Sequence, residues 1–385
     1  MRENSVQKKI REQIQALNDL GLSTTGIFFT SDMIQSGFVA PSHVQFVPIP
    51  ETVGNWFRSI RERRIRVNSL LEWAKQNAAE YNIFYVRNAA PNRRWFRFIR
   101  LYRDKIITEH QTKEIDQIKA LLKENPLGIK PGKFLSWMEY SAIPLLNEWV
   151  FGSLSLGKVK NLVAVTSEIA EYEKQRACFG IPNTYTVTNG IDTHSCPLRT
   201  SPEFTGKEIH LLMLVGGSTA VDWHGIDLIV GGIRNYKGPV HIVLHLAGED
   251  HLLNQYQDDF IIRHGYCNAE AIDKLADICH LALGTFAFQR KGLNEASTLK
   301  MREYAARGIP AVYAHTDPDY TGLVTAGLAL HLTPMQVPDM AKVIQFAENL
   351  YRDSLASIKI RNYAIANMDF QVKMKELSEI LLKIK

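Results

Sequence analysis

The sequence predicts an α/β protein of two doubly wound, Rossmann-like domains that face one another across a cleft. Short apolar runs rich in β-branched and aromatic residues alternate with amphipathic helical stretches along nearly the whole chain, which is typical of parallel sheets covered by helices. A chain of 385 residues is longer than one ordinary domain with a single hydrophobic core, and its length suits two domains. The polar, proline-bearing segment 196–206 has no periodicity and separates the two halves.

Each half carries its own predicted strands, with helices such as 69–80 and 169–179 between them. The strand candidates are 26–30, 44–48, 83–87, 105–109, 162–166 and 184–188, then 209–215, 241–247, 261–264, 278–283, 311–314 and 328–332. We expect an N-terminal domain over 1–200 and a C-terminal domain over 201–360. A helix over 361–385 is expected to pack back toward the N-terminal domain.

The start of the N-terminal domain departs from this pattern. A doubly wound domain normally opens with a buried strand and a glycine-rich turn into its first helix. In this sequence the helix 6–20 begins almost at once, and only Asn4 and Ser5 stand where the turn should be. We therefore expect either that the first N-terminal strand is missing or that the fold is a variant.

Composition predicts a cytoplasmic globular protein. Hydrophobic residues make up 45% and charged residues 22% of the chain, and no apolar run approaches the roughly 18–20 residues of a membrane span. The polar N-terminus predicts no secretory signal. The four cysteines lie scattered without a C-x-x-C pair, which favours reduced thiols over disulfides or a zinc site.

The segment 281–310 carries the strongest functional signal. It reads as strand, loop and helix, with Gly308 ending the helix and Pro310 opening the next strand. Ser297 and Thr298 are good N-terminal capping residues, and free N–H groups at that end attract anions. Glu295 lies in the loop and Glu303 two turns into the helix. Two glutamates eight apart are common by chance, so the pair gains weight only from its surroundings.

In those surroundings the sequence resembles glycosyltransferase family 4, which has the GT-B fold. Residues 295–310 match its Glu-x7-Glu signature with the following Gly-x-Pro. Five further segments match in order: 161–167, 188–192, 214–227, 246–248 and 264–266. The similarity is good over residues 160–312 and loose elsewhere.

The resemblance implies that the domain over 1–200 lies on the acceptor side and that the domain over 201–360 binds the nucleotide sugar. It also implies a role for each matching residue. Glu295 would contact the transferred sugar, Glu303 would bind the ribose hydroxyls, and the amides of Thr298 and Leu299 would hold the diphosphate. The turn Gly265, Tyr266 and Cys267 would present its backbone to the nucleobase, and Gly216 would begin the first turn of the donor domain. His110 matches a family histidine that reaches the donor sugar, although a structural role is as well supported.

One departure concerns the charge that neutralises the diphosphate. The family usually places Arg and Lys in the first turn of the donor domain, where this sequence has Ser218 and His224. A cation is still needed because the leaving diphosphate gains charge. We expect Lys300 or Lys291 to supply it, and Arg290 to be a solvated surface residue. Asp317-Pro-Asp319 spells a metal motif of another architecture, but a turn is the simpler interpretation.

The predicted function is transfer of a sugar from a nucleotide-diphosphate donor to a glycan or lipid-linked acceptor in bacterial surface polysaccharide synthesis, without metal or other cofactor. Retention of configuration is implied by the resemblance alone. A GT-B sugar-nucleotide epimerase and a catalytically inactive GT-B-like binding or scaffold protein are the alternatives.

The N-terminal half is basic and carries two arginine-rich stretches. Residues 1–200 contain 27 Lys and Arg against 19 Asp and Glu. The stretches Arg58–Arg66 and Arg93–Arg103 mix arginine with bulky apolar residues, a pattern that suits an anionic membrane surface. There we expect the arginines to meet the headgroups and the aromatic residues to lie at the interface. A solvated helix face is the alternative. Nucleic acid is the less favoured partner, because many enzymes of the resembled family use lipid-linked acceptors. Peripheral association of the protein with the inner face of the plasma membrane is therefore the alternative to a purely cytoplasmic location.

Overall fold

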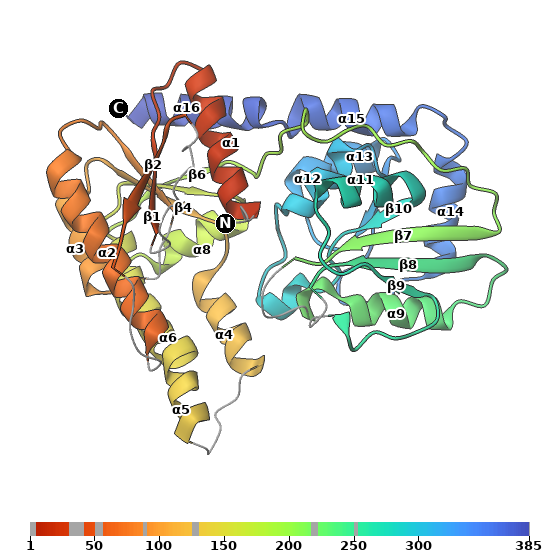
Figure 1. Cartoon of the computed structure of the whole chain (residues 1–385), viewed down its shortest axis with the longest axis horizontal. Helices are drawn as coiled ribbons and strands as arrows, with labels where there is room; N and C mark the ends of the chain where they lie inside the picture. The colour runs from red at the N-terminus through yellow and green to blue at the C-terminus, as the bar shows by residue number, and fades with distance from the viewer. Residues whose placement is uncertain are drawn as a thin grey trace. The chain divides into compact units, whose positions relative to one another are not determined.

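The computed structural model describes residues 5–30, 42–50, 57–87, 91–124, 131–216, 222–249 and 253–384 (Figure 1). The chain divides into two compact units. Unit 1 combines Met1–Val187 with Met374–Lys385, and unit 2 is Thr188–Lys373. Every strand pair in both units is parallel. The predicted α/β class with parallel, helix-covered sheets is confirmed.

Unit 1 contains a two-stranded sheet, β1-β2, and a four-stranded sheet, β3-β4-β5-β6. Its strands are β1 (Gly26–Thr30), β2 (Val44–Pro48), β3 (Phe84–Arg87), β4 (Ile106–His110), β5 (Asn161–Ala164) and β6 (Asn183–Thr186). Its helical segments are α1 (Ser5–Asp19), α2 (Arg58–Asn77), α3 (Arg93–Leu101), α4 (Glu114–Glu124), α5 (Pro131–Trp137), η1 (Met138–Ala142), α6 (Ile143–Asn147), η2 (Glu148–Gly152), α7 (Ser153–Leu156) and α8 (Ser167–Arg176).

The strands of unit 1 differ in burial. Strands β4 and β5 are buried along their whole length, whereas β1 and β3 are mostly half-exposed. Strand β1 pairs with β2, and β3 pairs with β4. Among the described residues, β1 and β3 therefore each keep one edge without a strand partner. Ser5 already lies in α1, and Asn4 lies outside the described residues.

The aromatic residues of α3 belong to the core of unit 1. Asn92 caps the helix by accepting hydrogen bonds from the N–H groups of Arg94 and Trp95. Trp95, Phe98 and Ile99 are at most 1% exposed and pack into one hydrophobic cluster. The expectation that the aromatic residues of 93–103 lie at a membrane interface is therefore wrong for Trp95 and Phe98, since the amphipathic helix turns them inward. Arginines of α2 and α3 remain exposed: Arg58, Arg64, Arg66, Arg93, Arg97 and Arg100.

Unit 2 is built on one six-stranded sheet of order β12-β11-β10-β7-β8-β9. The strands are β7 (Glu208–Leu214), β8 (His241–Ala247), β9 (Ile261–Arg263), β10 (Leu281–Leu283), β11 (Ala311–Tyr313) and β12 (Ala329–His331). The helical segments are η3 (Asp222–His224), α9 (Ile226–Asn235), α11 (Ala269–Ile278), η4 (Phe288–Lys291), α12 (Leu299–Ala306), η5 (Pro318–Tyr320), α13 (Thr321–Thr325), α14 (Met340–Leu350) and α15 (Ala356–Asn367). Helix α16 (Phe370–Ile384) begins in unit 2 and continues into unit 1.

A row of histidines crosses the sheet of unit 2. The Nδ1 atom of His210 on β7 lies 2.8 Å from Nε2 of His245 on β8, and Nδ1 of His245 lies 2.9 Å from Nε2 of His264 after β9. His280, just before β10, stacks on His210 and accepts its backbone N–H. Glu208 bonds the other ring nitrogen of His210 at 2.7 Å.

Candidate functional site

Glu295 lies in the loop that connects the carboxyl end of β10 to α12. The N–H of Ala296 donates to the carbonyl of Thr316, and the N–H of Thr316 donates to that of Asn294, both at 2.9 Å. These bonds and the bridge between Glu295 and Thr316 align the loop with the chain that follows β11. Glu295 is half-buried there. The carboxyl ends of parallel strands are where such sheets bind ligands.

The N-terminus of α12 receives little capping from the side chains that the sequence suggested. Thr298 occupies the capping position with extended backbone, but its side chain makes no capping hydrogen bond. Its Oγ1 is buried and has no hydrogen-bond partner among the described residues. The Ser297 hydroxyl instead accepts the N–H of Asn189 at 2.7 Å. The backbone amides at the N-terminus of α12, including that of Leu299, are therefore capped by neither the Ser297 nor the Thr298 side chain. They lie at the positive end of the helix dipole.

Glu303 lies on the same helix with its side chain 29% exposed. One carboxylate oxygen lies 3.3 Å from Nη1 of Arg307, which also binds Asp273. Gly308 ends the helix as predicted, with a φ of +72° that favours glycine. A Cβ there would also lie 2.5 Å from the carbonyl oxygen of Ser357.

Lys300, His224 and Gly216 form a connected group. The Lys300 ammonium donates to the carbonyls of Leu214 and Gly284, at 3.3 and 3.1 Å, and to Nδ1 of His224 at 3.0 Å. Nε2 of His224 then donates to the carbonyl of Gly216 at 2.9 Å. Burial lowers the pKa of Lys300 to about 7. Burial, and then the charge of Lys300, holds the pKa of His224 well below its usual value, so His224 is neutral.

The other predicted cations of unit 2 lie around η3 and η4. Lys291 has its ammonium 5.0 Å from the centre of the Trp223 ring. Arg290 makes a bidentate ion pair with Asp227, at 2.8 and 2.7 Å. Ser218 lies outside the described residues.

The turn Gly265–Cys267 follows β9, so it lies at the same carboxyl end of the sheet as the loop of Glu295. The N–H of Gly248 donates to the carbonyl of Gly265 at 2.9 Å, and Gly265 has a φ of +64°. Tyr266 is 61% exposed, whereas the Cys267 thiol is half-buried and burial raises its pKa. The turn therefore offers an exposed ring and a constrained backbone.

His110 lies in unit 1, at the end of β4, and is only 2% exposed. Its Nε2 lies 3.1 Å from the Thr108 hydroxyl, and its Nδ1 has no hydrogen-bond partner among the described residues. Burial, and next the charge of Arg176, lowers the pKa of His110 to about 3. Together with Glu148, these residues line a cavity of about 10 Å³. His110 is thus a neutral interior residue of unit 1.

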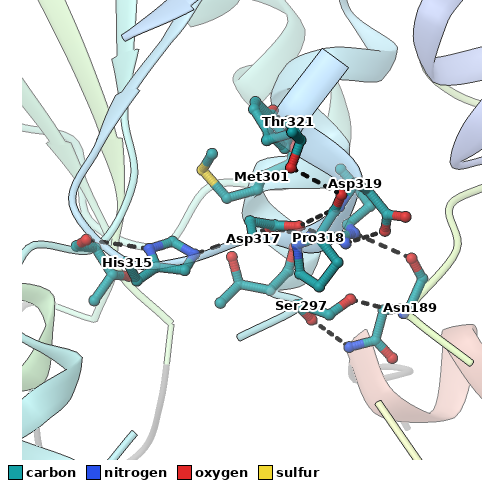
Figure 2. Close-up of polar contacts among 12 residues, drawn as sticks. Asn189, Ser297, Met301, His315, Asp317, Pro318, Asp319 and Thr321 are labelled. Carbon is teal, nitrogen blue, oxygen red and sulfur yellow. Dashed lines mark hydrogen bonds and ion pairs between the residues drawn. The ribbon is translucent and has the colours of Figure 1, made fainter. Parts of the chain in front are cut away.

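A buried ionic cluster beside the α12 loop escaped the sequence analysis. Asp317 and Asp319 both accept from the guanidinium of Arg302, which is fully buried on α12. Figure 2 shows these two aspartates near Ser297 and Asn189. Little in the sequence signals this cluster, because Arg302 is one of three charged residues in the helical segment 299–306 and nothing local marks it as buried. In the structure, the carboxylates of Asp317 and Asp319 therefore both bind arginine.

Comparisons with known proteins support the fold. No family model matches the sequence, and no curated protein matches it. Sucrose-phosphate synthase from Thermosynechococcus elongatus superimposes with a TM-score of 0.68 over 99% of this chain and 94% of its own, at 11% identity. Anabaena HepE in complex with UDP-glucose gives 0.60 over 99% and 97%, at 12% identity.

WaaG, a glycosyltransferase involved in lipopolysaccharide biosynthesis, gives a TM-score of 0.61 over 99% of this chain and 96% of its own, at 11% identity. Identities this low carry the fold and not the activity. The chain therefore has the two-domain GT-B fold of these glycosyltransferases.

Proposed function

We propose that the chain is a glycosyltransferase of family 4 type. It would transfer a sugar from a nucleotide-diphosphate donor to a glycan or lipid-linked acceptor in bacterial surface polysaccharide synthesis, with retention and without metal. The observation that carries this proposal is the α12 loop. There Glu295 and Glu303 flank a helix N-terminus that the Thr298 side chain leaves uncapped. The chain that carries this loop has the GT-B fold.

Each part of this loop suits one part of the donor. A helix N-terminus stabilises the diphosphate, whose charge grows as the sugar departs. The partly exposed carboxylate of Glu303 can accept hydrogen bonds from ribose hydroxyls, and Glu295 from the transferred sugar. Exposed Tyr266 and the backbone of Gly265 suit a nucleobase. The UDP-glucose complex of HepE supports this class of donor.

The test is a binding screen by calorimetry with UDP, GDP and ADP. We expect Glu303→Ala to weaken binding of the preferred nucleotide about ten- to hundredfold, because it removes a hydrogen bond to a carboxylate. Glu270→Ala is the matched control, since Glu270 is an exposed glutamate of unit 2 that pairs with the exposed Lys274. Equal affinities of the wild type and Glu303→Ala would contradict the assignment.

Metal independence is tested on the same enzyme by adding a chelator during turnover. We expect activity to persist, because helix amides and lysine can hold the diphosphate. Activity that is abolished by the chelator and restored by Mn²⁺ or Mg²⁺ would contradict this part of the proposal.

We propose further that unit 1 binds an anionic lipid surface. The support is the set of exposed arginines on α2 and α3, together with exposed apolar side chains on the neighbouring segment η1–η2, among them Trp149, Leu146 and Tyr140. The N–H of Ser59 donates to Glu139, which ties α2 to η1. Vesicle sedimentation should show binding that requires phosphatidylglycerol. Equal binding to neutral vesicles would contradict it.

One observation favours the alternative of an inactive nucleotide-binding protein. All three N–H groups of the Lys300 ammonium already donate to protein atoms, so Lys300 must exchange a hydrogen bond to contact a diphosphate. Hydrolysis and transfer assays with the nucleotide sugar that binds will separate the two. Binding without turnover supports the alternative.

A further inference from the structure

Arg302 occupies an unusual place for a charged side chain. It lies on α12 with none of its surface exposed. A buried charge is costly unless it is paired and fully hydrogen-bonded. Nη2 of Arg302 donates to Oδ1 of Asp317 at 2.9 Å, and the guanidinium makes further ion pairs with Asp317 and Asp319. The other oxygen of Asp319 lies 2.9 Å from the ammonium of Lys373. Two cations thus face two carboxylates.

The same guanidinium holds the donor-site loop. Its Nε donates to the carbonyl of Asn189 at 3.1 Å, and its Nη1 lies 3.5 Å from the carbonyl of Thr298. Asn189 in turn donates its backbone N–H and its side-chain amide to Ser297 (Figure 2). Three segments therefore meet on one side chain: residue 189, the start of α12, and the loop 317–319.

The cluster also contains one residue from each connection of unit 2 to the rest of the chain. Asn189 lies two residues after the boundary at 187/188, and Lys373 is the last residue before the boundary at 373/374. The two connections also bind one another. The N–H of Ile191 donates to the carbonyl of Met368, and the N–H of Phe370 donates to that of Ile191, both at 3.0 Å.

We propose that Arg302 is a positioning residue that fixes the donor loop 294–299 against both connecting segments, 188–193 and 368–373. It contacts no ligand in this role. It holds the N-terminus of α12 in the geometry that binds a nucleotide diphosphate, and it makes the conformation of the connections depend on that loop. The ligand part of this inference rests on the proposed function.

The experiment measures hydrogen–deuterium exchange and nucleotide affinity on the full chain. Arg302→Met should accelerate exchange in the three segments 294–299, 188–193 and 368–373. It should also weaken binding of UDP, GDP or ADP, whichever the wild type prefers, by about tenfold or more. Arg302→Lys should recover part of the affinity, because it restores the charge without the planar fork. Arg199→Met is the matched control. Arg199 is a buried arginine of unit 2 whose partners are Cys279, His280, Tyr351 and Ser357.

Two results overturn the inference: unchanged exchange at 294–299 in Arg302→Met, or the same three accelerated segments in Arg199→Met. Should Arg302→Met not fold, Asp319→Asn decides, since it keeps the pair of Arg302 with Asp317. It should accelerate exchange at 368–373 and leave 294–299 unchanged, and the reverse pattern overturns the inference. A wild type that binds none of the nucleotides contradicts the proposed function, while the exchange measurements still decide the role of Arg302.

Discussion

The two units solve the problem of buried charge in different ways. In unit 2, Arg302 and Lys373 face Asp317 and Asp319, so that two cations meet two carboxylates. Burial alone would raise the pKa of Asp319, but the two cations outweigh it and the pKa is lowered. Burial raises the pKa of Asp317 despite the attraction of Arg302. Because the two cations equal the two carboxylates in number, the cluster is neutral without a bound proton.

In unit 1 a single guanidinium serves two buried glutamates. Nη2 of Arg176 donates to Glu148 at 2.6 Å, and its Nε lies 3.5 Å from Glu173. Burial raises the pKa of Glu173 to about 8, against the attraction of Arg176. The second carboxyl group thus holds a proton at neutral pH. A cluster balanced by protons should respond to pH, whereas one balanced by fixed charges should not.

The largest effect is expected from removing the shared cation of unit 1. Arg176→Met leaves Glu148 and Glu173 buried without a cation, and it should lower the free energy of unfolding by about 3–5 kcal/mol. Urea denaturation measures this loss. Adding Glu148→Gln should recover part of it, because the unpaired charge is removed. A loss within the range of ordinary surface substitutions, about 0.5 kcal/mol, would contradict the role of Arg176 as the shared cation.

Raising the pH from 7 to 8 should move the stabilities of the two units in opposite directions. The pKa of Glu173 is raised from 4.5 to about 8, so its contribution to stability is present below 4.5 and is lost as pH rises through 8. The pKa of Lys300 is lowered from 10.5 to about 7, so unit 2 gains stability as pH rises above 7. Each slope is at most about 1.4 kcal/mol per pH unit.

Hydrogen exchange in β5 and β10, corrected for the intrinsic effect of pH, reports the two units separately. Glu173→Gln should flatten the response of β5 alone, and Lys300→Met that of β10 alone. A shift of both strands in the same direction in the wild type would contradict the expected opposition.

Acid should weaken unit 2 through its histidine row, with a smaller effect. Burial lowers the pKa of His245 to about 4 from 6.5, so its contribution is present above 6.5 and is lost as pH falls through 4. His245→Asn should reduce the acid sensitivity of β8 in exchange measurements. His241→Asn, at the exposed end beside Glu208, should not. Equal effects of the two variants would rule out a special role for the buried ring.

The smallest expected difference separates two buried serines. The Ser155 hydroxyl in unit 1 has no hydrogen-bond partner among the described residues, so Ser155→Ala should change the free energy of unfolding by less than about 0.5 kcal/mol. The Ser297 hydroxyl in unit 2 accepts the N–H of Asn189, so Ser297→Ala should cost about 1 kcal/mol or more. Thermal melts of both variants make the test, and an equal loss would contradict it.

Local sequence patterns predicted most of the strands. Runs such as 26–30, 44–48 and 241–247 coincide with β1, β2 and β8, because β-branched and aromatic alternation reports strand burial directly. The predicted helix 69–80 instead begins at Arg58, since its first turns carry few apolar residues to mark them.

The site was predictable only as far as local signals reach. The loop of Glu295 and the helix of Glu303 lie where the motif indicated. The cluster around Arg302 was missed because its partners Asn189 and Lys373 come from distant parts of the chain, and Asn189 is 113 residues away. Pairing of that kind depends on tertiary packing, which periodicity does not encode.

The division of the chain has a consequence for synthesis on the ribosome. Residues 1–187 emerge before unit 2, but unit 1 also needs residues 374–385, which emerge after it. At about 5–20 residues per second, unit 1 waits on the order of ten to forty seconds for that segment. Met374 and Leu377 are 1% exposed in the folded protein, so the surface they cover stays open during the wait. Unit 2 is continuous in sequence, and its last residue, Lys373, emerges directly before that segment, so the unit that is made first is completed last.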